Sequence, residues 1–177
     1  VPEETLMPQT PLTDGFGRAF HYLRLSVDEA CNFKCVYCLP DGFKKSYEEP
    51  PLSAEEVRRL IGAFCEVGFW KVRLTGGEPT TRNDVLELAR ICASTPGIRK
   101  VALSTNGYRL AELARPLAEA GVKAVNVSVD SLDKERFARI SSAPAFGFAA
   151  IQARIAVMVT ASAGRTPRST KTRPIAV

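Results

Sequence analysis

The chain has 177 residues, 45% of them hydrophobic and 24% charged, which suits one domain with a sizeable core. No apolar run approaches the length of a membrane span. The first residues also lack the basic-then-apolar pattern of a secretory signal. We therefore expect no membrane partner.

The formal net charge of +5 comes from the end of the chain. Residues 136–177 contain seven Lys or Arg and no Asp or Glu, whereas the first 135 residues carry 17 basic and 19 acidic groups. This near balance argues against a basic nucleic-acid-binding domain, and we expect no nucleic-acid partner. The alternative interpretation, a basic disordered tail that contacts nucleic acid, is left open, although aromatic residues do not interleave with the charges of the tail.

In chain order, residues 1–20 are rich in proline and lack periodicity, which is typical of an extended arm. Residues 21–27 alternate enough to predict a first strand. The connection over residues 28–51 contains three prolines and a glycine, which exclude a long helix. Long connections of this kind are usually functional.

The first predicted helix begins after Ser53. Ser53 and Glu56 have the spacing of a capping box, in which each side chain satisfies a free backbone N–H. Gly68 is placed to end this helix in a left-handed conformation. The apolar stripe that predicts the helix consists of Val57, Leu60, Ile61 and Phe64.

Further strands are predicted over residues 70–75, 98–104 and 122–129. Further helices are predicted over residues 83–94 and 109–120, the second interrupted near Pro116, and another helix start at Phe137. Strands separated by about a dozen helical residues are typical of βα units around a parallel sheet. In such folds the ligand site lies at the carboxyl ends of the strands.

Three cysteines, at positions 31, 35 and 38, follow the first predicted strand. Three thiolates from one loop can hold three irons of a four-iron cluster and leave the fourth iron open. Zinc is the nearest alternative, but structural zinc takes four ligands, usually as two pairs, and His21 is the single histidine of the sequence. Such reduced cysteines fit a cytoplasmic protein.

The other two cysteines, Cys65 and Cys92, lie among apolar residues of predicted helices. Free cysteine in such a setting is usually an inert core residue, so a disulfide is the weaker reading.

Arg24 and Arg73 each interrupt an otherwise apolar strand. Simple alternation could put them on a polar face. If both faces of the parallel sheet are covered, however, a buried arginine needs an anion. The guanidinium group suits phosphate because it binds two oxygens at once.

Five motifs occur in order: YLRLSV at 22–27, CNFKCVYCLP at 31–40, VRLTGGEP at 72–79, STNG at 104–107 and NVSVDS at 126–131. This series resembles radical S-adenosylmethionine (SAM) enzymes, and among them the GTP 3′,8-cyclases that begin molybdenum-cofactor synthesis. The resemblance covers about residues 14–140. It implies an α/β fold of parallel βα repeats that form the first four units of a partial (βα)6 radical SAM barrel.

The resemblance also implies the ligands. A single four-iron, four-sulfur (4Fe-4S) cluster in this chain would be held by Cys31, Cys35 and Cys38. The residues implied to bind SAM are Tyr37, Gly77 and Ser128. The residues implied to bind the substrate GTP are Arg24, Arg73 and Ser104.

By the same resemblance, the protein would be a lyase that cyclises GTP, with no catalytic residue beyond the cluster and with an external electron donor. The full-length family carries a second cysteine triad for a second cluster, which this sequence lacks. The sequence leaves open whether the protein forms a homodimer. The alternatives are another radical SAM enzyme acting on a peptide or small molecule, and an iron–sulfur-binding fragment without activity.

We therefore divide the chain into an arm over 1–20, a truncated radical SAM core over 21–140 and a divergent basic tail over 141–177. The tail shows no strand pattern and no acidic residue, so we expect it to be frame-shifted or disordered. We expect this chain alone not to convert GTP, because no recognisable residues hold the guanine.

Overall fold

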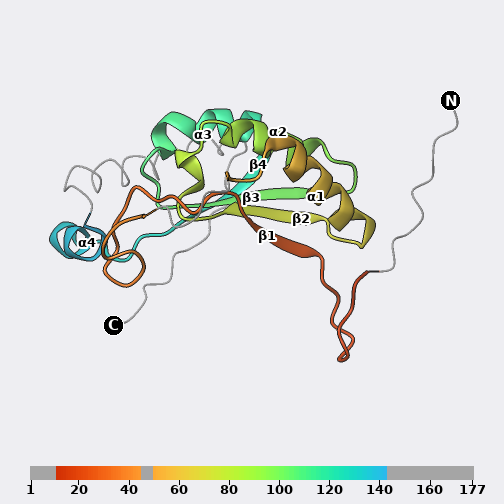
Figure 1. The fold of residues 1–177 in the computed structure, drawn as a ribbon, viewed down its shortest axis with the longest axis horizontal. Coiled ribbons are helices and arrows are strands. Elements are labelled where there is room, and N and C mark those ends of the chain that lie inside the picture. Colours follow the sequence, from red (N-terminus) through yellow and green to blue (C-terminus); the bar gives the residue numbers. More distant parts are fainter. Residues whose placement is uncertain (1–10, 45–49, 143–177) are drawn as a thin grey trace, which may run out of the picture.

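The computed structural model describes residues 11–44 and 50–142. Figure 1 shows a four-stranded sheet with helices packed against it. The strands are parallel and follow one another in sequence order: β1 (Tyr22–Ser26), β2 (Lys71–Thr75), β3 (Lys100–Thr105) and β4 (Val122–Val127). The helices are α1 (Ala54–Glu66), η1 (Pro79–Thr81), α2 (Val85–Ser94), α3 (Leu110–Glu119) and α4 (Lys134–Ser141).

The strand order explains where the helices lie. Parallel strands that are neighbours in both sequence and space are joined by right-handed crossovers, which place successive helices on the same face. Accordingly, α1, α2 and α3 cover one face of the sheet, and α4 lies beyond its carboxyl edge, beside the connection that follows β1 (Figure 1). The predicted parallel βα repeats are confirmed.

Alternation along the strands separates a core face from a polar face. In the register, Leu25, Leu74 and Leu103 are paired neighbours, and all three are buried beneath the helices. The adjacent row pairs Arg24 with Arg73, on the opposite face.

Within the described residues no helix covers that polar face (Figure 1). The condition for a fully buried arginine, a sheet covered on both faces, is therefore not met by the described residues alone. On this face Arg24 is exposed and Arg73 is half-buried.

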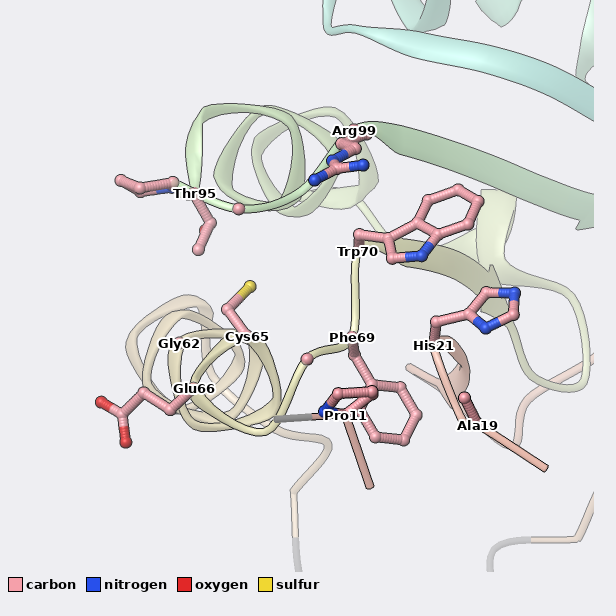
Figure 2. A pocket seen from close by; sticks show the side chains of 13 residues that line it. Pro11, Ala19, His21, Gly62, Cys65, Glu66, Phe69, Trp70, Thr95 and Arg99 are labelled. Carbon is pink, nitrogen blue, oxygen red and sulfur yellow. The ribbon is translucent and has the colours of Figure 1, made fainter. Parts of the chain in front are cut away.

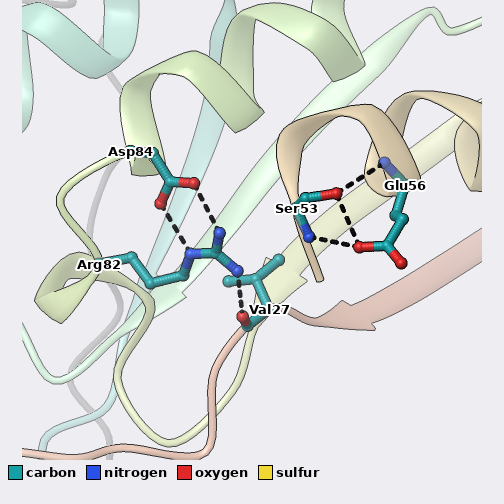
Figure 3. A network of polar contacts seen from close by, with 5 residues as sticks. All are labelled: Val27, Ser53, Glu56, Arg82 and Asp84. Carbon is teal, nitrogen blue, oxygen red and sulfur yellow. Dashed lines mark hydrogen bonds and ion pairs between the residues drawn. The ribbon is translucent and has the colours of Figure 1, made fainter. Parts of the chain in front are cut away.

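Helix α1 begins and ends as predicted. Ser53 Oγ accepts from the Glu56 N–H at 3.3 Å, and Glu56 Oε2 accepts from the Ser53 N–H at 2.8 Å (Figure 3). Gly68, with φ of 92°, follows the last turn in the left-handed region. The capping box and the glycine stop are both confirmed.

Two helices differ from the prediction. Helix α3 runs without a break through Pro116. The proline removes one N–H donor from the helix, but the burial of Leu113, Ala114 and Leu117 on the apolar face of α3 outweighs that loss. Helix α4 begins earlier than Phe137, at Lys134, where Asp133 caps it by accepting from the Arg136 N–H at 2.7 Å.

The arm and the tail are described only in part. Residues 13 and 19 form an antiparallel bridge, and the Leu12 N–H donates to Val67 O, at the end of α1, at 3.3 Å. The predicted tail lies outside the described residues except for Ser141 and Ser142. In the described ranges no helix is both long enough and apolar enough to cross a bilayer.

A hollow of about 660 Å³ opens at the amino ends of the strands (Figure 2). Trp70, which precedes β2, stacks on His21, which precedes β1, with ring centroids 4.9 Å apart. Cys65 of α1 lines the same hollow. Since the cysteine triad follows β1, His21 lies at the opposite end of the sheet and is not placed to join those cysteines around a metal.

The cap of α1 gives the first testable prediction. Ser53→Ala removes the acceptor for the Glu56 N–H and should lower the free energy of unfolding by about 1 kcal/mol, measured by urea denaturation. Ser53→Thr keeps a hydroxyl acceptor and should stay close to the parent. Equal losses in the two variants would contradict the assigned cap.

Candidate functional site

The five motifs meet at the carboxyl edge of the sheet. The connection after β1 carries the three cysteines and is called here the cysteine loop (residues 28–44). The segment 76–78 leaves β2, residues 106–107 leave β3, and Ser128 leaves β4, where its N–H donates to Thr105 O at 2.9 Å. Parallel strands bring their carboxyl ends together, so this edge is the candidate site.

The cysteine loop is anchored to α4 by its backbone. The N–H groups of Lys34 and Val36 donate to the carbonyls of Ser141 and Ile140 at 3.2 and 2.9 Å. Within the loop, the N–H groups of Cys38 and Leu39 both donate to Cys35 O, at 2.9 and 3.0 Å. A loop without regular secondary structure thereby has a defined path.

The cysteines of the triad differ in exposure: Cys31 and Cys35 are half-buried, and Cys38 is exposed. Phe33 and Phe137 form a small apolar cluster, with ring centroids 6.2 Å apart, against which Cys31 and Cys35 pack. This backing excludes water from one side of the triad.

The three thiols lie within electrostatic reach of one another. Burial is the main cause that raises the pKa of Cys31, and hydrogen bonds from the Phe33 N–H and the Asn106 side chain oppose it. Burial is also the main cause that raises the pKa of Cys35, and the negative charge of Asp130 raises it further. For both thiols the charge of Cys38 contributes a further increase of pKa.

The donor set fits an iron–sulfur cluster. Three thiolates come from one loop, with an apolar wall behind them and N–H donors beside Cys31. Within the described residues no three His, Cys, Asp or Glu side chains lie close enough to hold a single metal ion. Ligands of separate irons in a cluster need a wider spacing than the ligands of one ion.

The segment after β2 touches the cysteine loop through its backbone. The N–H groups of Gly77 and Glu78 donate to Asp28 O and Ala30 O, each at 2.8 Å. A Cβ atom at Gly77 would lie 2.3 Å from Glu29 O and 2.4 Å from Ala30 O. Only a residue without a side chain permits this approach.

Glu78, which is 1% exposed, connects two strand exits. Its Oε1 accepts from the Thr80 N–H at 3.0 Å, from the Thr105 hydroxyl at 2.7 Å and from the Thr80 hydroxyl. Its Oε2 accepts from the Asn106 N–H at 2.6 Å. Four donors compensate for the burial of this carboxylate, which holds the exits of β2 and β3 together.

Arg82 secures the start of the cysteine loop (Figure 3). Its Nη1 donates to Val27 O at 2.6 Å, and its Nε and Nη2 donate to the Asp84 carboxylate at 2.7 and 2.6 Å. The hydrogen bond from Arg82 is the main cause that holds the pKa of Asp84 below its usual value. The pair therefore fixes the direction in which the chain leaves β1.

Tyr37 lies on the outer side of the cysteine loop, with 67% of its surface exposed. Its hydroxyl donates to both carboxylate oxygens of Asp130, each at 3.0 Å. Loss of water around the hydroxyl, and then the bond to Asp130, raise the pKa of Tyr37 above its usual value. This bond ties the cysteine loop to the segment after β4.

The three residues expected to bind GTP lie on the polar face of the sheet. Arg73 Nη1 donates to Ser104 Oγ at 3.3 Å, across β2 and β3. Arg73 Nε is buried and has no hydrogen-bond acceptor among the described residues. Arg24 is the register neighbour of Arg73 and is exposed, with no polar partner in the described ranges. An anion on this face would supply the missing acceptor.

The structure thus joins most of the predicted residues and adds others. Arg73 meets Ser104 directly, Gly77 meets the cysteine loop, and Tyr37 reaches the segment that follows Ser128. Sequence reasoning missed the side-chain partners that hold the site together, which are Asn32, Glu78, Arg82, Asn106 and Asp130. Their positions within or beside the five motifs were the only signal.

The family model described as Radical SAM superfamily matches residues 25–156, more than half of the chain. The chain belongs to the radical SAM superfamily. Curated relatives named GTP 3′,8-cyclase share its sequence: the protein from Shewanella denitrificans is 52% identical over 130 residues, and that from Vibrio cholerae is 54% identical over 130 residues. These alignments cover 73% and 72% of this chain but 39% of each relative, so the chain spans about two fifths of their length.

Solved structures support the radical SAM fold. HydG, a maturase of the FeFe-hydrogenase, matches with a TM-score of 0.65 at 17% identity, over 79% of this chain and 32% of its own. Streptococcus suis SuiB bound to S-adenosylmethionine matches with a TM-score of 0.58 at 19% identity, over 74% and 30%. At this identity the likeness concerns the fold alone.

The docking of this radical SAM protein's glycine segment is testable. Gly77→Ala places a methyl group on the carbonyls of the cysteine loop and should lower the free energy of unfolding by about 1–3 kcal/mol. Gly62→Ala is the matched control, because Gly62 lies within α1 with nothing within 4 Å of its added Cβ. It should stabilise the protein by about 0.5–1 kcal/mol. If urea denaturation showed the same effect for both variants, the close approach at Gly77 would be disproved.

Proposed function

We propose that this radical SAM protein is of the type that converts GTP to 3′,8-cyclo-7,8-dihydro-GTP, the first step of molybdenum-cofactor biosynthesis, and that the 177-residue chain alone does not complete this conversion. The observation that carries the proposal is the buried Nε of Arg73, without an acceptor among the described residues, on the polar face beside Ser104. The names of the curated relatives, GTP 3′,8-cyclase, support the same activity.

Cys31, Cys35 and Cys38 would hold one 4Fe-4S cluster with an open iron for SAM. Bound there, the cluster would supply the electron that splits SAM into methionine and a 5′-deoxyadenosyl radical. The residues of the chain itself would position the ligands and shield the cysteine triad from water. The apolar cluster of Phe33 and Phe137 keeps water from one side of the triad, and Glu78 fixes the segment that faces it.

SAM would lie against Tyr37, Gly77 and Ser128. The backbone at Gly77 has no side chain to obstruct a ligand, and its neighbours are held by the cysteine loop. Tyr37 and Ser128 lie on the loop and on the β4 exit that the Tyr37–Asp130 hydrogen bond brings together.

GTP would lie over the polar face of the sheet, next to the triad. Arg24 and Arg73 are register neighbours, so their guanidinium groups can share one triphosphate. Ser104 already accepts from Arg73, which orients the guanidinium group before the phosphate binds. Cations on this face favour an anionic substrate over a neutral peptide.

The same proposal implies an electron donor and a cytoplasmic location, since reduced cysteines and a low-potential cluster need a reducing compartment. The division of the chain into an arm, a core and a tail stays a prediction from the sequence.

Cluster binding is tested by anaerobic reconstitution of the 177-residue chain. We expect about four irons per chain, because one cysteine triad is present. Cys35→Ala should abolish the cluster absorbance, whereas Cys65→Ala, at the opposite end of the sheet, should retain it. Close to eight irons per chain would refute the single cluster, and full loading of Cys35→Ala would refute the ligand set.

GTP binding is tested at Arg73. Arg73→Ala removes a charged donor to the triphosphate and should weaken GTP binding by about 1.5–3 kcal/mol, measured by equilibrium dialysis. Arg90→Ala, on the exposed surface of α2, should leave GTP affinity unchanged. SAM affinity should change little in either variant. Equal losses of GTP and SAM affinity in Arg73→Ala would indicate a structural arginine instead.

A further inference from the structure

Tyr22 is a residue of the polar face that the proposed function does not use. It begins β1, and its register neighbour is Lys71, which begins β2. Leu23 and Leu25, which alternate with Tyr22 and its neighbours along β1, pack into the core beneath the helices. Alternation therefore turns the ring of Tyr22 to the polar face, where Arg73 also lies.

Two cations gather on the ring of Tyr22. Lys71 Nζ lies 4.2 Å from the ring centroid, and the central carbon of the Arg73 guanidinium group lies 5.7 Å from the same centroid. The quadrupole of an aromatic ring attracts a cation that lies over its face within about 6 Å. Among the described residues neither cation forms an ion pair with a carboxylate. The ring of Tyr22 is therefore an electrostatic partner that both cations share.

Arg73 is held from both neighbouring strands. On the β3 side, its Nη1 donates to Ser104 Oγ at 3.3 Å. On the β1 side, the guanidinium group lies over the ring of Tyr22. Neither contact uses Nε, which is buried and has no acceptor in the described ranges. A ring attracts a cation more strongly where water is partly excluded, as it is around this half-buried side chain.

We propose that Tyr22 is a positioning residue of the anion site, and that its ring holds the Arg73 guanidinium group in the orientation that binds the triphosphate. This inference rests on the proposed function, because it takes GTP as the anion on the polar face. A guanidinium group that is already ordered loses less conformational freedom when the anion binds. The ring thereby raises the affinity for GTP without touching GTP itself.

The test is equilibrium dialysis of GTP, and separately of SAM, against the reconstituted 177-residue chain. Tyr22→Leu removes the ring but keeps an apolar side chain, and the dissociation constant for GTP should rise about fivefold. Tyr22→Phe keeps the ring. Because the Tyr22 hydroxyl forms no hydrogen bond within the described residues, the GTP affinity of Tyr22→Phe should stay close to that of the parent. SAM affinity should change little in either variant.

Phe16→Leu is the matched control. Phe16 lies in the arm and is exposed, and the central carbon of the Arg18 guanidinium group lies over its ring, 5.5 Å from the centroid. The substitution removes the same kind of contact away from the polar face, so GTP affinity should not change. Equal losses of GTP affinity in Phe16→Leu and Tyr22→Leu would show that the effect is not specific to the anion site, and would overturn the inference.

The other outcomes are also decisive. An equal loss of GTP affinity in Tyr22→Phe and Tyr22→Leu would assign the effect to the hydroxyl and overturn the role of the ring. Equal losses of GTP and SAM affinity in Tyr22→Leu would make Tyr22 a structural residue of the sheet, which also overturns it. Unchanged GTP affinity in Tyr22→Leu, with a loss in Arg73→Ala, would overturn the inference and leave the proposed function intact. Failure of the parent chain to bind GTP would instead contradict the GTP site of the proposed function.

Discussion

The site depends on a contact between two backbones, that of residues 76–78 and that of residues 28–30. The cysteine loop has no strand or helix of its own, so its N–H and C=O groups need partners from elsewhere. Gly77 and Glu78 supply two N–H groups to its first turn. The absence of a side chain at Gly77 is what makes the distance short enough.

The buried carboxylate of Glu78 extends this contact to the next strand. A single charged group with four donors is strongly constrained, because each lost donor would leave part of the charge unsatisfied. The result is a rigid edge in which the exits of β2 and β3 keep a fixed separation. A ligand bound there meets groups that do not need to reorganise.

The sequence allowed local features to be predicted and left the long-range ones hidden. The parallel βα repeats, the capping box at Ser53 and the stop at Gly68 follow from neighbouring residues, and they are confirmed. The bonds from Tyr37 to Asp130 and from Asn106 to Asn32 join residues 93 and 74 positions apart. No periodicity encodes such pairs. The continuity of α3 through Pro116 was also missed, because packing outweighed local propensity there.

The bonds from Lys34 and Val36 to the carboxyl end of α4 set an order of events during synthesis. The cysteines leave the ribosome about a hundred residues before Ile140 and Ser141, the carbonyls that hold their loop. At about 5–20 residues per second, this interval lasts on the order of 5–20 s. During it the cysteine loop lacks its two backbone hydrogen bonds to α4. The loop can therefore take its complete path only after the fourth βα unit has been made.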